Sequence, residues 1–188
     1  MRGWVKMILI LFVLPILVGG VVLLVAGRPV AFEVLQRRIA RKFPDVEWIK
    51  TEDLARWRED PGQPQAVVLD GRTDEEFRVS QLRGAVRIDP YRPSLRPLQG
   101  FAKDTQLVVY SSAGYRGARV ASWLERAGYT NVRNLSGGIF KWADEGRPIF
   151  RGETPAVLVH PYDRNWGLLV AGEYRADAPA VEKRSAGP

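Results

Sequence analysis

Residues 111–117 combine the residue types and the spacing that bind an anion. The apolar run of residues 107–110 predicts a buried strand, and a helical pattern begins at Arg116. A strand that breaks into a tight loop at the start of a helix directs several backbone N–H groups to one point, and the helix dipole adds positive potential there. Arg116 adds a fixed charge and a fork of donors. The predicted anion-binding residues are Ser111, Ser112, Ala113, Gly114, Tyr115, Arg116 and Gly117.

The hydroxyl of Ser111 is the candidate reactive group in this loop, and its chemistry depends on a base. A serine oxygen is a poor nucleophile at neutral pH unless a neighbouring base takes its proton. The chain has one histidine, His160, whose simpler interpretation is a polar residue at a strand end. Ser111 has two interpretations: part of a non-covalent anion site with Ser112, Gly114 and Arg116, or a small polar filler. Arg116 has a second interpretation as the partner of a structural carboxylate.

The composition excludes several other kinds of site. None of the 188 residues is cysteine, which rules out disulfides, thiolate metal ligands and persulfide formation on a cysteine. No metal site and no cofactor are predicted. The net charge of +7 is concentrated near the N-terminus, because residues 1–42 contain seven basic residues and one acidic residue. Residues 43–188 are nearly neutral, so nucleic acid is not a predicted partner.

Around the loop, apolar runs and helical patterns alternate along the chain. Five runs predict strands, over residues 46–49, 66–69, 85–88, 106–110 and 131–135. Helical patterns lie between them, with Thr51 as an N-cap, Thr73 and Glu76 as a capping box, and a last helix after residues 136–138. Continuous apolar runs suit strands that are buried on both faces. The alternation predicts an α/β fold, with a parallel five-stranded sheet covered by helices on both faces.

Several segments of this region resemble the rhodanese (sulfurtransferase) family, in the family's order. They are VVLDGRTDEEF, QLRGAVRI and VVYSSAGYRGARVASWLERAGYTNVRNLSGGIFKWADEGRPI. The family's active loop runs Cys-x-x-Gly-x-Arg-Ser/Thr, and its positions correspond to Ser111, Gly114, Arg116 and Gly117. The LSGGIFKW segment resembles the family's Gly-Gly-x-x-x-Trp signature. The resemblance implies a rhodanese-like domain over residues 46–150, with Asp70 and Arg72 at positions that support the structure.

The departures from the family pattern decide the predicted function. Rhodaneses carry sulfur on the loop cysteine as a persulfide, and Ser111 stands at that position. Residues 81–85 read Gln-Leu-Arg-Gly-Ala where the family often has His-Ile-Pro-Gly-Ala, and position 117 is glycine. The resemblance therefore implies a catalytically inactive domain, a binding or scaffolding module with a residual anion-binding loop. The alternative is an enzyme with altered chemistry at this loop, either a weak sulfurtransferase or a serine-based hydrolase.

The N-terminal segment predicts a membrane anchor. Residues 7–27 carry no charge over 21 positions, a length at which a helix crosses a hydrocarbon core of about 30 Å. A cleaved signal peptide is the alternative, although its apolar core is usually only about 7–15 residues long. We expect a retained single-pass anchor over residues 1–27. Five basic residues follow the span against Arg2, Lys6 and the α-amine before it, a balance that favours a cytoplasmic location for the domain.

Residues 28–45 predict a short basic amphipathic helix next to the membrane. Phe32, Leu35, Ile39 and Phe43 recur at helical spacing among arginine and lysine residues, and Pro44 ends the pattern. One interpretation is a helix that lies on anionic lipid, and the other is a helix that packs on its own domain. The predicted partners are membrane lipid, through residues 7–27 and 32–43, and an anion or a membrane protein complex.

Residues 151–188 lie outside the resemblance. A C-terminal hairpin is expected, with strands at residues 157–159 and 168–170 around the turn-prone residues 162–165. The tail from Ala176 is rich in alanine, proline and charge, a composition typical of disorder.

Overall fold

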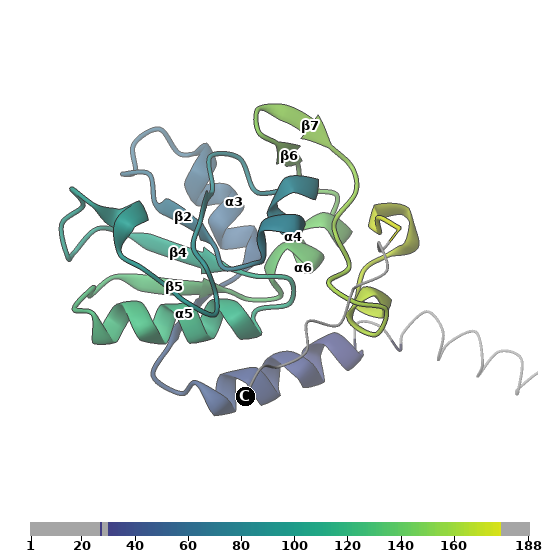
Figure 1. Cartoon of the computed structure of the whole chain (residues 1–188), viewed down its shortest axis with the longest axis horizontal. Helices are drawn as coiled ribbons and strands as arrows, with labels where there is room; N and C mark the ends of the chain where they lie inside the picture. Colours follow the sequence, from purple (N-terminus) through teal and green to yellow (C-terminus); the bar gives the residue numbers. More distant parts are fainter. Residues whose placement is uncertain (1–26, 28–29, 178–188) are drawn as a thin grey trace, which may run out of the picture. The chain divides into compact units, whose positions relative to one another are not determined.

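A computed structural model describes residue 27 and residues 30–177 of the chain (Figure 1). The chain divides into two compact units, residues 1–35 and 36–188. In the first unit, residues 30–35 begin a helix that runs to residue 42. The predicted anchor over residues 7–27 lies outside the described residues except for Gly27. No helix in the described ranges is both long and apolar enough to cross a membrane.

The second unit is built on a five-stranded parallel sheet. Its strands are β1 (Glu47–Ile49), β2 (Val67–Asp70), β3 (Val86–Arg87), β4 (Leu107–Tyr110) and β5 (Val132–Leu135). They lie in the order β1-β5-β4-β2-β3, which makes β4 the central strand, and every pairing is parallel. The predicted α/β fold with a parallel five-stranded sheet is confirmed, and each strand begins one residue later than the apolar pattern predicts.

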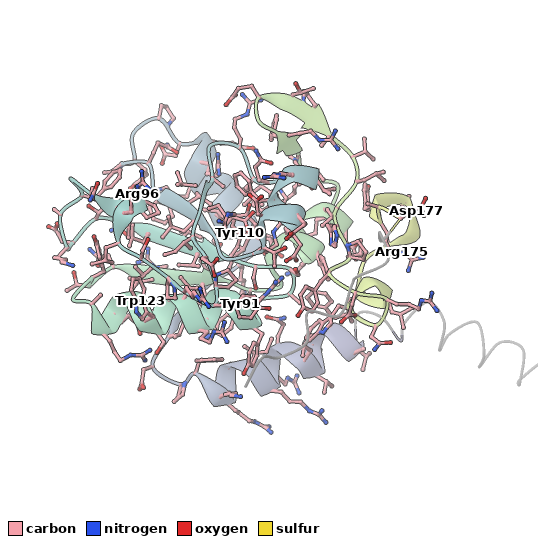
Figure 2. The ribbon with its side chains drawn as sticks, viewed as in Figure 1. Tyr91, Arg96, Tyr110, Trp123, Arg175 and Asp177 are labelled. Carbon is pink, nitrogen blue, oxygen red and sulfur yellow. The ribbon has the colours of Figure 1, made fainter. Side chains whose placement is uncertain are left out.

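The central strand β4 is buried along its whole length. All four of its residues are buried, and Tyr110 lies in the interior of the molecule (Figure 2). The hydroxyl of Tyr110 donates to Asp70 and accepts a hydrogen bond from the N–H of Leu82 at 3.1 Å, and burial raises its pKa. Asp70 also pairs with Arg72 at 2.7 Å, and both side chains are fully buried. This network has the structural role that the resemblance implies for Asp70 and Arg72.

Helices and one 3-10 turn connect the strands in order. They are α3 (Thr51–Glu59), α4 (Asp74–Val79), η2 (Arg96–Leu98), α5 (Tyr115–Arg126) and α6 (Gly138–Asp144). The chain moves outward from β2 to β3 and then turns back through β4 to β5. Because crossovers between parallel strands are right-handed, this reversal puts α5 on the face opposite to α3 and α4. Figure 1 shows α5 along one face of the sheet, while α3 and α6 pack against each other on the other side.

The reversal also fixes where a ligand site can form. The connection after β2 leaves the sheet in one direction, and the connection after β4 leaves in the other. In open α/β sheets, ligands bind in the crevice outside the carboxyl ends of two such strands. The loop after β4, which is residues 111–114, and the start of α4 after β2 meet at this crevice.

Local sequence signals explain one helix start and fail at another. At α4, the Thr73 hydroxyl accepts from the N–H of Glu76 at 3.3 Å, and the Glu76 carboxylate accepts from the N–H of Thr73 at 3.0 Å. This is the predicted capping box. At α3, however, Thr51 is the first helical residue and Lys50 occupies the N-cap position. The N-cap assigned to Thr51 is wrong because its hydroxyl donates instead to Glu145, at 2.9 Å.

The second half of the N-terminal helix is attached to the sheet unit. The side chain of Gln36 donates to the carbonyl oxygen of Ala113 at 2.7 Å and accepts from the N–H of Gly137 at 3.0 Å. Ile39 is buried, and the rings of Phe43 and Tyr115 meet edge to face at 5.5 Å. For residues 36–43, these contacts agree with the interpretation of a helix that packs on its own domain.

The C-terminal extension forms a hairpin earlier than the sequence pattern suggests. The hairpin joins β6 (Ile149–Arg151) and β7 (Thr154–Ala156), with Gly152 at a φ of +60° in the turn. The hairpin expected from residues 157–159 and 168–170 is wrong. Asp163 accepts hydrogen bonds from the N–H groups of Asn165 and Trp166, at 2.8 and 2.9 Å, and so starts the 3-10 turn η3 (Trp166–Leu169). A further 3-10 turn, η4 (Gly172–Tyr174), follows, and the tail beyond residue 177 lies outside the described residues.

Candidate functional site

The start of α6 holds the loop after β4 in place. The carbonyl oxygens of Ser111 and Ser112 accept hydrogen bonds from the N–H groups of Ile139 and Phe140, at 2.9 and 3.0 Å. A Cβ atom at Gly138 would lie 2.1 Å from the Ser111 oxygen, and the φ of +57° there favours glycine. The second glycine of the LSGGIFKW segment therefore lets α6 approach the loop closely.

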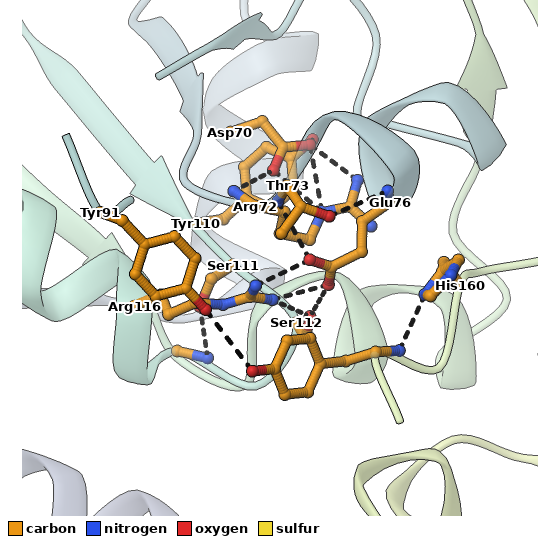
Figure 3. A network of polar contacts seen from close by, with 12 residues as sticks. Asp70, Arg72, Thr73, Glu76, Tyr91, Tyr110, Ser111, Ser112, Arg116 and His160 are labelled. Carbon is orange, nitrogen blue, oxygen red and sulfur yellow. Dashed lines mark hydrogen bonds and ion pairs between the residues drawn. The ribbon is translucent and has the colours of Figure 1, made fainter. Parts of the chain in front are cut away.

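Among the residues that the structure describes, no base is bonded to the hydroxyl of Ser111. The Ser111 side chain is 1% exposed, and its oxygen accepts a hydrogen bond from the N–H of Gly114 at 3.2 Å. His160 is turned to a different partner, because its Nδ1 accepts from the N–H of Tyr162 at 3.0 Å. Figure 3 shows His160 on the far side of Glu76 from Ser111. Burial lowers the pKa of His160, and the structure does not bring its ring together with Ser111.

The guanidinium of Arg116 is paired with a carboxylate. Its two terminal nitrogens donate to the two oxygens of Glu76, at 2.7 and 2.6 Å (Figure 3). Ser112 joins the pair, since its hydroxyl accepts from Arg116 at 2.8 Å and donates to Glu76 at 2.6 Å. The Arg116 side chain is 10% exposed and that of Glu76 is 1% exposed. This contact agrees with the interpretation of Arg116 as the partner of a structural carboxylate.

The pair keeps Glu76 ionised although the carboxylate is buried. Burial alone would raise the pKa of Glu76. The hydrogen bonds and the charge of Arg116, together with the charge of Arg72, outweigh this effect and lower the pKa to about 2. The same pairing raises the pKa of Arg116 against the opposing effect of its burial. At neutral pH the two charges therefore cancel within the loop.

Position 117 is glycine because a neighbouring side chain occupies the space. A Cβ atom at Gly117 would lie 2.3 Å from the Oδ1 atom of Asn134. The Asn134 amide is fixed there, since its Nδ2 donates to the carbonyl oxygen of Gly114 at 2.9 Å. The serine or threonine that the family pattern has here would collide with Asn134.

A pocket with a volume of about 170 Å³ opens over the loop. Five of the seven predicted residues line it, namely Ser111, Ser112, Ala113, Tyr115 and Arg116. Gly114, at a φ of +103°, and Gly117 shape the loop backbone without lining the pocket. In the described part of the chain, no group of three His, Cys, Asp or Glu side chains is placed to hold a metal ion.

The pocket is also lined by four residues that the sequence analysis did not identify as site residues. They are Tyr91, Arg119, Tyr162 and Trp166. The helical period offered a signal for Arg119, because it lies one turn after Arg116 on the same face of α5. No local signal marked the three aromatic residues, which come from the loop between β3 and η2 and from the extension after β7.

Comparison with known proteins finds a family profile and similar folds for this chain. A profile described as "Rhodanese-like domain" matches residues 50–145, about half of the chain. A protein from Bacillus halodurans has a similar fold, with a TM-score of 0.55 at 18% identity over 73% of this chain and 97% of that one. A protein of Anabaena has a TM-score of 0.50 at 21% identity, over 56% of this chain and 81% of that one.

The curated relatives are longer proteins. A tRNA uridine(34) hydroxylase of Listeria monocytogenes is 38% identical over 80 residues, which are 39% of this chain and 24% of the relative. One from Sodalis glossinidius is 29% identical over 135 residues, 60% of this chain and 38% of the relative. The chain thus spans between about a quarter and two fifths of the length of these relatives.

Proposed function

Since the chain belongs to the rhodanese-like domain family and contains no cysteine, we propose that it is a binding module rather than a sulfur carrier. One observation carries this proposal: an oxygen stands where the family's persulfide forms, and a serine hydroxyl cannot make the S–S bond. The module keeps the fold and the loop of the family, and it uses them to bind an anion without covalent chemistry.

The geometry of the loop supports non-covalent anion binding. The first N–H groups of an α-helix have no intrahelical partner, and the first two residues of α5, Tyr115 and Arg116, line the pocket together with Ser111. The helix dipole gives them positive potential. Because Glu76 neutralises Arg116, the attraction for an anion comes from the start of α5 and from any unneutralised cation nearby, not from Arg116 itself.

We further propose that the module is attached to a membrane. The uncharged stretch of residues 7–27 supports a single-pass anchor, and the basic residues after it support a cytoplasmic domain. Ile39 and Phe43 pack on the domain, so lipid contact by the helix falls to its exposed basic side chains, such as Arg38 and Arg41. In this arrangement the domain presents its pocket to a partner in a membrane protein complex.

The alternative of altered chemistry lacks a proton acceptor. In the described residues, Ser111 accepts a hydrogen bond from a backbone N–H, and neither His160 nor a carboxylate contacts its hydroxyl. A serine-based hydrolase needs such a base. The tRNA hydroxylase named above is a much longer protein, and the near neutrality of residues 43–188 does not support extending an RNA substrate to this chain.

The test is sulfur transfer by the full-length chain purified in detergent. Thiosulfate–cyanide turnover is measured for the natural protein and for Ser111→Ala. We expect the two rates to be equal and indistinguishable from the rate without protein. Turnover that falls when Ser111 is changed would overturn the proposal, because it would make the serine a reactive group. Titration of the natural protein with inorganic phosphate tests whether the pocket binds an anion. The absence of detectable phosphate binding would reject this part of the proposal.

A further inference from the structure

Arg119 gives the pocket a positive charge that the Glu76–Arg116 pair does not cancel. It lines the pocket one helical turn after Arg116 and is half-buried. Its guanidinium donates to the carbonyl oxygen of Pro90 and lies 5.2 Å from the centre of the Tyr91 ring. None of the ion pairs formed by the described residues includes Arg119. The unneutralised charge of the pocket therefore lies on Arg119.

Three aromatic side chains from outside the loop also line the pocket. Tyr91 comes from the loop before η2, whereas Tyr162 and Trp166 come from the extension after β7. The hydroxyls of Tyr91 and Tyr162 approach to 3.5 Å, so the two side chains meet at their polar ends. Aromatic side chains that line a pocket favour a flat, apolar guest.

The position of Tyr162 is built into the fold. Its φ is +68°, a conformation that a bulky side chain rarely adopts. The N–H of Tyr162 is fixed by Nδ1 of the buried His160, and its ring lies 4.4 Å from the guanidinium of Arg116. The buried histidine thus holds this ring over the loop although it does not reach Ser111.

We propose that the pocket binds an aryl anion, a single aromatic ring that carries a phosphate, sulfate or carboxylate group. Arg119 pairs with the charge, and Tyr91, Tyr162 and Trp166 contact the ring. The volume of about 170 Å³ suits this guest, since an apolar cavity of about 150 Å³ holds one benzene molecule. The inference rests on the proposed anion-binding role of the loop and adds the class of ligand.

The test compares three ligands by isothermal titration of the full-length protein in detergent. They are phenyl phosphate, inorganic phosphate and benzyl alcohol, which separate the contributions of ring and charge. We expect phenyl phosphate to bind about tenfold more tightly than inorganic phosphate, a difference of about 1.4 kcal/mol. A peptide with one phosphotyrosine distinguishes a protein-borne aryl phosphate from a free one, because only a pocket open to a chain binds it as tightly as phenyl phosphate.

Three variants separate the contribution of the charge from that of the ring. Arg119→Gln should weaken both phosphate ligands at least tenfold, and Arg119→Lys should restore part of that loss. Tyr162→Leu should remove the preference for phenyl phosphate and leave inorganic phosphate unchanged. The matched control is Arg126→Gln, an exposed arginine two turns further along α5 whose side chain donates to Ser122. Thermal unfolding of each variant verifies that it is folded.

The outcomes separate this inference from the proposed function. If the natural protein binds phenyl phosphate and inorganic phosphate with equal affinity, the proposal of an aryl ligand is overturned, and the proposal of anion binding still holds. Binding of neither phosphate overturns the proposed function and this inference with it. If Arg119→Gln binds both ligands as the natural protein does, the charge is recognised elsewhere and the role of Arg119 is rejected.

Discussion

The guanidinium of Arg116 is bonded through two nitrogens to the carboxylate of Glu76, at 2.6 and 2.7 Å. The two residues are 40 positions apart and come from the helices that follow β2 and β4. Their pairing joins α4 to α5 across the crevice at the strand ends. It also fixes Ser112, so the wall of the pocket depends on an ion pair that the loop sequence alone does not reveal.

We predict that Glu76→Gln destabilises the folded protein strongly. The substitution removes one charge of a buried pair and leaves Arg116 uncompensated, a change that typically costs about 3–5 kcal/mol. Urea unfolding monitored by near-UV circular dichroism measures the loss. The control is Glu59→Gln at the exposed end of α3, which should cost less than about 0.5 kcal/mol. A similar small loss for both variants would contradict a stabilising role for the pair.

The same pair should make stability fall at acidic pH. The pKa of Glu76 is about 2 in the folded protein, below its ordinary value of about 4.3 when unfolded. The contribution of its ionised form is therefore complete above pH ~4.3 and is lost as the pH falls toward about 2, a loss of roughly 3 kcal/mol. The difference in unfolding free energy between the natural protein and Glu76→Gln should shrink across this range. A difference that stays constant from pH 7 to pH 2.5 would refute the assignment.

A cysteine at position 111 should take up sulfur. Ser111→Cys puts a thiol at the start of α5, where the N–H of Gly114 and the helix dipole favour the thiolate. After incubation with a sulfane donor, mass spectrometry should detect the gain of one sulfur atom that a reductant removes. Ser112→Cys, the adjacent position, is the control, and it should remain unmodified. A folded Ser111→Cys protein that gains no sulfur would mean that the loop no longer stabilises a bound anion.

Adding one methyl group at position 117 should be costly, and the cost should depend on Asn134. Gly117→Ala brings a Cβ atom to 2.3 Å from the Asn134 amide oxygen, which forces overpacking of about 1–3 kcal/mol. In the background of Asn134→Ala, the same substitution should cost markedly less. A double-mutant cycle from thermal unfolding measures the coupling. Additive losses would show that the two positions do not collide.

The elements that local sequence determines were predictable. The capping box of Thr73 and Glu76 involves residues three apart, and the apolar run of β4 reflects burial on both faces. The order of segments also identified the family through its motifs. These features need no knowledge of distant partners, so the chain reveals them by itself.

The features that distant contacts determine were not predictable. The carboxylate that pairs with Arg116, the ring of Tyr162 and the carboxylate that accepts from the Thr51 hydroxyl all come from remote parts of the chain. The hairpin prediction for the extension was wrong because Asp163 starts a 3-10 turn there. Gly152 allows the tight turn of the observed hairpin at an earlier position. These contacts and turn positions depend on tertiary packing, which cannot be deduced from the pattern of neighbouring residues.

Gln36 connects the loop after β4 to the start of α6. Its amide joins the peptide oxygen of Ala113 to the N–H of Gly137, so it spans the two backbones that shape the pocket floor. Loss of the Gln36 amide would therefore loosen the loop and the start of α6 from each other at the wall of the pocket. By linkage, an anion bound in the pocket would in turn stabilise the two contacts of Gln36.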